Sequence, residues 1–226
     1  MERPGAGVRQ REVARAERRR ISLGKVLLFT SALHAGLWEL AVAHKPEPPG
    51  RGSPPVERRE IYHRSPRLDL VTQDGTPLSL RDLKGKVVLV TFFYSTCPDV
   101  CPLLTAKFAV IQRRLKEKGL DRAVHLLSIT VDPEIDTPPV LKEYARKYGA
   151  NFASWAFLTG SRSALEQTWN DFGVVAVRGS KGDIDHTAMT ILLDPQGRQR
   201  LQYIGFGWLE EDVIRDIEVL VQEIGR

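Results

Sequence analysis

From residue 67 onward, short apolar runs alternate with amphipathic stretches. The runs at 86–93 and 123–131 are almost continuously apolar, which is typical of strands buried on both faces. Between them, residues 102–120 place apolar side chains at helical spacing and end at a Lys-Gly pair. Strands that alternate with helices of this length predict parallel β-α-β units in an α/β fold.

The rest of this region follows the same pattern. Asp-Gly and Asp-Pro-Gln-Gly turns separate short apolar runs and predict hairpins, and further amphipathic stretches predict helices. The hairpins are expected at 68–80 and 187–204, a short strand at 155–158, and helices at 137–148, 161–172 and 208–224. The sequence thus predicts one α/β domain over 67–226 with a central mixed sheet.

The first 66 residues are organised differently. Residues 1–20 are rich in arginine, 21–43 form an apolar run, and 44–66 contain six prolines. Since roughly 20 apolar residues span a bilayer as a helix, 21–43 is predicted to be a transmembrane anchor behind a basic cytoplasmic tail. A cleaved signal peptide is the alternative, because residues 41–43 have the A-x-A pattern of a cleavage site. Both interpretations export the domain, which follows a proline-rich linker over 44–66.

The charge distribution supports this division. The net charge is +5, yet residues 1–66 carry 13 Lys and Arg against 7 Asp and Glu, while residues 67–226 carry 20 against 21. The basic character therefore belongs to the N-terminal segment, where it sets membrane orientation. A domain this close to neutral lacks the basic face of a nucleic-acid-binding protein.

The chain has only two cysteines, Cys97 and Cys101, between the strand at 86–93 and the helix at 102–120. Four helical residues advance about 6 Å and slightly more than one turn, so both thiols are expected on one face. There they can form a disulfide or bind one metal ion. A disulfide over so short a loop removes little unfolded-state entropy, and a helix start lowers a thiol pKa. The pair therefore indicates chemistry rather than stabilisation.

Thiolates are soft ligands, but two are too few for a closed structural zinc site. One additional imidazole gives a site that suits copper. His186 is the candidate because it lies in a polar loop that leads into the strand at 188–193, whereas His125 begins a buried strand and is expected to be a satisfied structural imidazole. The neighbouring Asp185 either orients His186 or is a solvated acid.

Two further acids follow the strand at 123–131, whose end is expected near the cysteines. Asp132 precedes a proline, so it either supports a metal ligand or forms a turn. Asp136 is expected to cap the helix at 137–148.

Three motifs occur in the order and spacing of a known family. They are CPDVCP at 97–102, VDPE at 131–134 followed by DTP at 136–138, and DHT at 185–187. Over residues 65–226 the chain resembles the Sco/SenC family of copper chaperones. The resemblance implies a thioredoxin-like fold and one copper ion, Cu(I) or Cu(II), bound by Cys97, Cys101 and His186. It also implies a role in assembling the CuA site of cytochrome c oxidase subunit II, with a redox-active Cys97–Cys101 disulfide that controls copper binding.

Two other functions compete with copper delivery, so it stays open whether the protein is an enzyme. A thiol–disulfide oxidoreductase acting on exported proteins would use the same cysteines, although such enzymes usually have C-x-x-C spacing. A peroxidase is disfavoured because its characteristic proline is missing ahead of Cys97. The export pattern places the domain in a bacterial periplasm, or in the mitochondrial intermembrane space of a eukaryote.

Overall fold

The computed structural model describes residues 57–180 and 183–224. The predicted basic tail, the predicted anchor and residues 44–56 of the predicted linker lie outside this range. Within it, no helix combines the length and apolar character needed to cross a membrane.

Eight strands form one mixed sheet, in the order β1-β10-β9-β4-β5-β6-β2-β3. The central strands β4, β5 and β6 are parallel to one another, and the remaining pairs are antiparallel. The strands are β1 (Glu57–His63), β2 (Asp69–Thr72), β3 (Pro77–Ser79), β4 (Val87–Phe93), β5 (Val124–Thr130), β6 (Trp155–Thr159), β9 (Met189–Leu193) and β10 (Gln199–Ile204). The predicted α/β domain with a central mixed sheet is confirmed.

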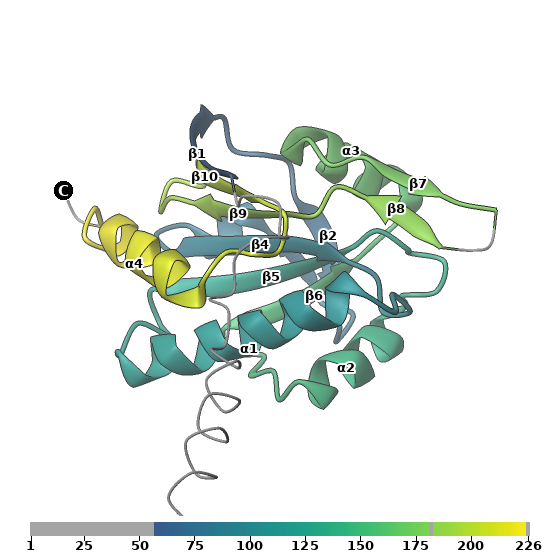
Figure 1. Cartoon of the computed structure of the whole chain (residues 1–226), viewed down its shortest axis with the longest axis horizontal. Coiled ribbons are helices and arrows are strands. Elements are labelled where there is room, and N and C mark those ends of the chain that lie inside the picture. Colours follow the sequence, from purple (N-terminus) through teal and green to yellow (C-terminus); the bar gives the residue numbers. More distant parts are fainter. Residues whose placement is uncertain (1–56, 181–182, 225–226) are drawn as a thin grey trace, which may run out of the picture. The chain divides into compact units, whose positions relative to one another are not determined.

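Helices cover both faces of the sheet (Figure 1). They are α1 (Val100–Glu117), α2 (Pro138–Lys147), α3 (Arg162–Phe172) and α4 (Glu210–Val221), with a 3-10 turn at Leu80–Leu83. The last two residues of β4 point to opposite faces, as successive strand residues do. Phe92 packs on Phe172 of α3, with ring centroids 5.4 Å apart, while Phe93 packs on Tyr144 of α2 at 5.2 Å. Because β4 is buried on both faces, its sequence is continuously apolar.

Three strands were missed by the sequence prediction. Residues 57–63, assigned to the linker, form β1, which pairs with β10 at one edge of the sheet. This strand is mostly exposed and charged, because an edge strand needs backbone pairing rather than an apolar face. The segment that follows α3 was given no strand, and residues 182–187 were expected to be a polar loop, yet β7 (Ala176–Arg178) and β8 (Ile184–His186) form a separate two-stranded sheet there.

The topology brings two loops to the same edge of the main sheet. Phe93, the last residue of β4, is in register with Thr130, the last residue of β5, and Val131 N–H donates to the Phe93 carbonyl at 2.8 Å. The loop 94–99 and the loop 131–137 therefore leave the sheet side by side. Ligand sites of α/β proteins are commonly found at this carboxyl edge.

Candidate metal and thiol site

The cysteines lie where β4 gives way to α1. Cys97 is in the connecting loop, and its N–H donates to the Tyr94 carbonyl at 3.2 Å. Cys101 is in the first turn of α1, followed by Pro102, whose missing N–H costs nothing at that position. Cys97 is partly exposed, whereas only 1% of Cys101 is exposed. Both cysteines are free thiols in the structure.

The two thiols differ in acidity. Burial opposes ionisation of Cys97, but hydrogen bonds from the Asp99 backbone and from Cys101 outweigh it and hold the pKa of the Cys97 thiol below its usual value. Deeper burial and the adjacent Cys97 raise the pKa of Cys101. Cys97 is thus the thiolate that forms first and the sulfur that an incoming molecule can reach.

His186 comes to this pair from β8. Its Nε2 lies 3.8 Å from the Cys101 Sγ, and its Nδ1 lies 3.2 Å from the Thr187 carbonyl. Because a carbonyl only accepts, Nδ1 carries the proton, and the Nε2 lone pair faces the sulfur. Burial lowers the pKa of His186, which favours the neutral ring that metal binding requires. His186 was predicted to lie near both cysteines, and the structure places its ring next to the sulfur of Cys101.

The two predicted supporting acids differ in their surroundings. Asp132 is buried, with its side chain 2% exposed, and pairs with Arg178 of β7. Asp185 is exposed and lies directly opposite Val177 in the β7–β8 ladder, whereas His186 lies opposite Ala176. Asp185 thus points to the other face of the hairpin from His186, and the group that orients the imidazole is the Thr187 carbonyl.

The expected cap at Asp136 is wrong. The residue preceding α2 is Thr137, and the Asp136 carboxylate is fully buried. It accepts hydrogen bonds from the Ser95 backbone N–H at 3.1 Å, from the Ser95 hydroxyl and from the Thr130 hydroxyl. The Asp-Thr-Pro pattern is typical of a helix start, so it gave no indication that Asp136 contacts Ser95, which is 41 residues earlier.

Sequence reasoning also missed Arg178 and misjudged His125. Arg178 lies in a segment that was expected to be irregular, and no local signal marks its long-range partner. His125 is buried in β5 as expected, but neither of its ring nitrogens has a hydrogen-bond partner among the described residues, so it is not satisfied. Burial, and then the charge of Lys86, lower the pKa of His125 to about 4.

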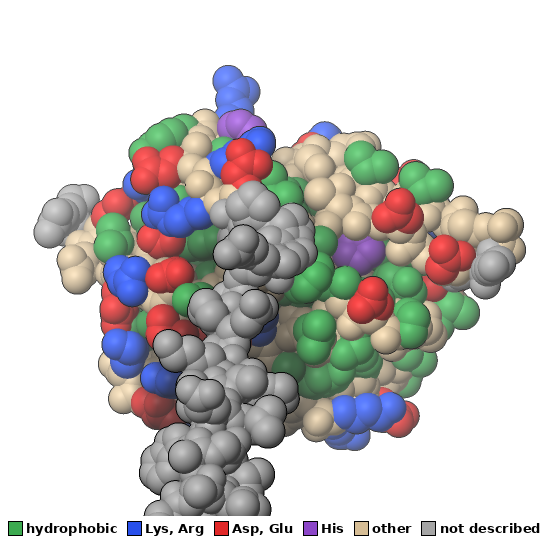
Figure 2. Space-filling view, in the orientation of Figure 1, with side chains coloured by type: hydrophobic (Ala, Val, Ile, Leu, Met, Phe, Trp, Pro, Cys, Tyr) green, Lys and Arg blue, Asp and Glu red, His purple; other side chains and the backbone are tan. Residues whose placement is uncertain are grey.

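A cavity of about 420 Å³ opens at the site. Its lining includes both cysteines and His186, together with Asp99, Asp183 and Asp185 and several apolar residues. Figure 2 shows hydrophobic and acidic side chains mingled over the β7–β8 hairpin and the start of α1. Among the described residues, no three Cys, His, Asp or Glu side chains are already arranged around a metal-binding position. The donors that gather here are nevertheless soft sulfur and neutral imidazole, which suit copper.

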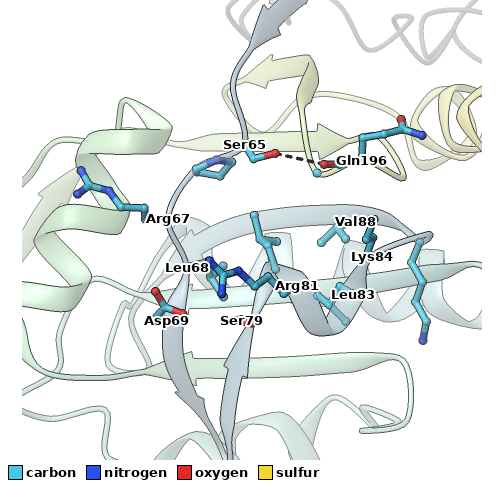
Figure 3. Close-up of a pocket in the computed structure, with 14 residues that line it drawn as sticks. Ser65, Arg67, Leu68, Asp69, Ser79, Arg81, Leu83, Lys84, Val88 and Gln196 are labelled. Carbon is cyan, nitrogen blue, oxygen red and sulfur yellow. Dashed lines mark hydrogen bonds between the residues drawn. The ribbon is translucent and has the colours of Figure 1, made fainter.

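A second cavity, of about 330 Å³, lies at the opposite end of the sheet (Figure 3). Its floor includes Leu68, Leu83 and Val88, and its cationic lining residues are Arg67, Arg81, Lys84 and Lys86. None of the predicted site residues lines this cavity. The chemistry predicted from the sequence therefore belongs to the end of the sheet that carries the cysteines.

Comparisons with known proteins agree with this assignment. The sequence model of the SCO1/SenC family matches residues 57–222. The "SCO1 protein homolog" of Bacillus subtilis is 35% identical over 150 residues, which are 65% of this chain and 77% of the relative.

Two solved structures extend the comparison. One is BsSco, described as a member of the Sco family of cytochrome c oxidase assembly proteins with a disulfide switch. Its sequence is 31% identical to this chain and its structure matches with a TM-score of 0.64. The match covers 73% of this chain and 96% of BsSco. The copper-bound ScoI of Bradyrhizobium japonicum is 28% identical, with a TM-score of 0.60. This match covers 69% of this chain and 98% of ScoI. The thioredoxin-like fold is thereby confirmed.

Proposed function

Because the chain belongs to the SCO1/SenC family, we propose that it is a copper metallochaperone in which Cys97, Cys101 and His186 hold one copper ion as cargo. The approach of His186 Nε2 to the Cys101 Sγ, at 3.8 Å, carries this proposal. The Cys97 side chain lines the same cavity as Cys101 and His186, so all three donors face one space. Two thiolates and one imidazole favour Cu(I) over harder metal ions.

The proposed recipient is the CuA site of cytochrome c oxidase subunit II. BsSco is described as a cytochrome c oxidase assembly protein, and ScoI has been solved with copper. Copper would pass by ligand exchange, in which cysteine thiolates of the recipient replace those of the chaperone one at a time. Cys97 would be exchanged first, because it is the partly exposed sulfur.

Oxidation would switch this site off. When Cys97 and Cys101 form a disulfide, two electrons and two protons leave, and neither sulfur remains a thiolate ligand. The relative BsSco is described as having a disulfide switch, which supports the same role for this pair. Around the ligands, we assign Asp132 to holding the His186 hairpin through Arg178, and Asp185 to adding negative charge to the rim of the cavity.

The proposed location follows from the N-terminal pattern. An arginine-rich segment ahead of the apolar run at 21–43 would anchor the chain in a membrane with residues 1–20 in the cytoplasm. The copper site would then face the periplasm, or the intermembrane space in a mitochondrion. Protease treatment of intact spheroplasts tests this placement: the domain is expected to be degraded from outside, and full protection would contradict export.

Copper titration of the full chain in detergent tests the main proposal. We expect the reduced chain to bind one Cu(I) in competition with a chromogenic chelator, and the oxidised chain to bind none. Cys97→Ser and Cys101→Ser should each lose high-affinity binding. Asp69→Asn, in the lining of the second cavity, is the matched control and should bind as the parent does. Equal binding by the reduced and oxidised chains would rule out the cysteines as ligands.

A thiol–disulfide oxidoreductase is the second candidate, favoured by the low pKa and partial exposure of Cys97. The Cys97 thiolate would attack a partner disulfide and form a mixed disulfide, releasing one partner thiolate. The Cys101 thiol would then lose its proton and displace the second, leaving the partner reduced and this chain oxidised. A chain that reduces such disulfides but binds no copper would establish this function instead.

A further inference from the structure

The loop 131–137 contacts both halves of the candidate site. On one side, Asp136 accepts hydrogen bonds from Ser95, two residues before Cys97, with the Ser95 N–H at 3.1 Å and the hydroxyl of the same residue also bonded. The Thr130 hydroxyl donates to the same carboxylate. This contact ties the cysteine loop to the end of β5.

On its other side, the same loop holds the hairpin that carries His186. The Asp132 carboxylate pairs with the guanidinium of Arg178, which also lies 3.4 Å from the Glu134 Oε2. Arg178 lies opposite Ile184 in the β7–β8 ladder, two residues before His186. The ion pair therefore acts on the strand that delivers the imidazole.

The hairpin depends on such ties because it forms a sheet of its own. Its contacts with the cysteine side are weak. His186 approaches the Cys101 sulfur at 3.8 Å and the Tyr94 ring at 6.0 Å between centroids, and the Ile184 N–H lies 3.4 Å from the Tyr94 hydroxyl, at the long end of the hydrogen-bond range. Loss of the Asp132–Arg178 pair would be costly. The Asp132 side chain is 2% exposed, and a buried carboxylate without a counter-ion is strongly destabilising. A single short loop thus fixes both the sulfur side and the imidazole side.

We propose that the loop 131–137 is a bridge that sets the separation of Cys101 and His186, with Asp136 and Arg178 as its two positioning residues. Resting on the proposed copper function, the bridge explains how a ligand on a separate hairpin meets a thiol in α1. Groups that orient metal ligands commonly change metal affinity 10- to 100-fold when they are removed. A similar effect is expected here from residues that touch no metal.

The test uses the full reduced chain and Cu(I) competition. Arg178→Ala should weaken Cu(I) binding by roughly 10- to 100-fold, and Arg178→Lys should restore part of the loss because it keeps the charge but not the fork geometry. Arg162→Ala is the matched control. This arginine also contacts Glu134, at 3.6 Å, but lies on α3 rather than on the hairpin, so its removal should leave copper affinity unchanged.

A double-mutant cycle separates positioning from general stability. If Arg178 acts through His186, Arg178→Ala should weaken binding in the parent and have almost no further effect in a His186→Ala background. An equal loss in both backgrounds would overturn the proposal. The Cu(II) thiolate absorption of Arg178→Ala should also shift toward that of His186→Ala, which a merely destabilised chain would not show.

A measurement without copper keeps the bridge testable if the chain binds none. In the metal-free protein, Arg178→Ala should speed hydrogen exchange at the amides of 176–180 and 183–186 by at least several-fold, whereas Arg162→Ala should not. Unchanged exchange in Arg178→Ala would refute the bridge. Faster exchange in a chain that binds no copper would refute only the proposed function.

Discussion

The two ends of the β4–β5 pair each have a histidine and a cavity nearby, yet only one end brings a histidine and thiols together. At the cysteine end, both ring nitrogens of His186 have neighbours, the Thr187 carbonyl on one side and the Cys101 sulfur on the other. At the opposite end, His125 is 6% exposed, and both of its nitrogens lack partners among the described residues. Burial lowers the pKa of both histidines. Burial alone therefore does not distinguish a ligand, whereas directed partners do.

The two cavities also differ in the charged residues that line them. Among the described residues, the cysteine-end cavity is lined by three aspartates, Asp99, Asp183 and Asp185, and by no Lys or Arg, while the opposite cavity is lined by Asp69 and four Lys or Arg residues. Anionic surroundings favour a cationic cargo such as copper and disfavour anionic competitors. The contrast supports the proposed metal chemistry at the cysteine end, and substitutions of the two histidines test it.

The largest expected effect is on copper binding. Removing one ligand of a metal site should cost about 3–4 kcal/mol, since four-ligand structural zinc sites total roughly 10–16 kcal/mol. We therefore expect His186→Ala to weaken Cu(I) affinity by roughly a thousandfold in chelator competition. His125→Gln, at the buried histidine of the other end, should leave the affinity unchanged. Equal losses in both variants would mean that the effect reports fold stability.

The next effect is on acid stability and belongs to His125. Its pKa is about 4 in the folded chain, below the usual value of 6.5, so unfolding takes up a proton between these two pH values. Stability should therefore be complete above about pH 6.5 and fall as the pH drops, losing up to about 3 kcal/mol by pH 4.

His125→Leu isolates this contribution, because the carboxylates that also titrate in the window remain in both proteins. Urea unfolding at pH 7 and pH 4.5 measures it. The loss of stability between the two pH values should be smaller in the variant by about 2 kcal/mol. Parallel curves for parent and variant would show that His125 is solvated or paired.

A smaller effect is expected at the cysteine loop. Ser95→Ala removes one hydroxyl from a buried carboxylate and should lower the free energy of unfolding by about 1–2 kcal/mol. Alkylation of Cys97 should become faster because the loop before it is held less firmly. Thr96→Ala, an exposed neighbour in the same loop, is the control and should change neither quantity. A variant Ser95→Ala as stable as the parent would argue that the backbone N–H of residue 95 and the Thr130 hydroxyl are enough for Asp136.

The elements that sequence predicted well are those with a local cause. The apolar run of β4 and the helical spacing of α1 reflect burial of each segment, and the cysteine pair follows from the junction between them. His186 was placed by a family resemblance rather than by its own pattern. The Asp132–Arg178 and Asp136–Ser95 contacts were not predictable, because each joins loops 46 and 41 residues apart and leaves no period in the sequence.

The smallest expected effect comes from one charge, that of Lys86 near His125. Among the described residues, Lys86 is the one charged group that lowers the pKa of His125, and it contributes less than burial does. Lys86→Met should therefore raise the His125 pKa only slightly, measured from the ring proton shifts during an NMR titration, and leave His186 untouched at the other end. Since burial persists in this variant, His125 should still titrate well below the usual value. A return of the His125 pKa to the usual value would mean that the charge of Lys86, rather than burial, disfavours the protonated imidazole.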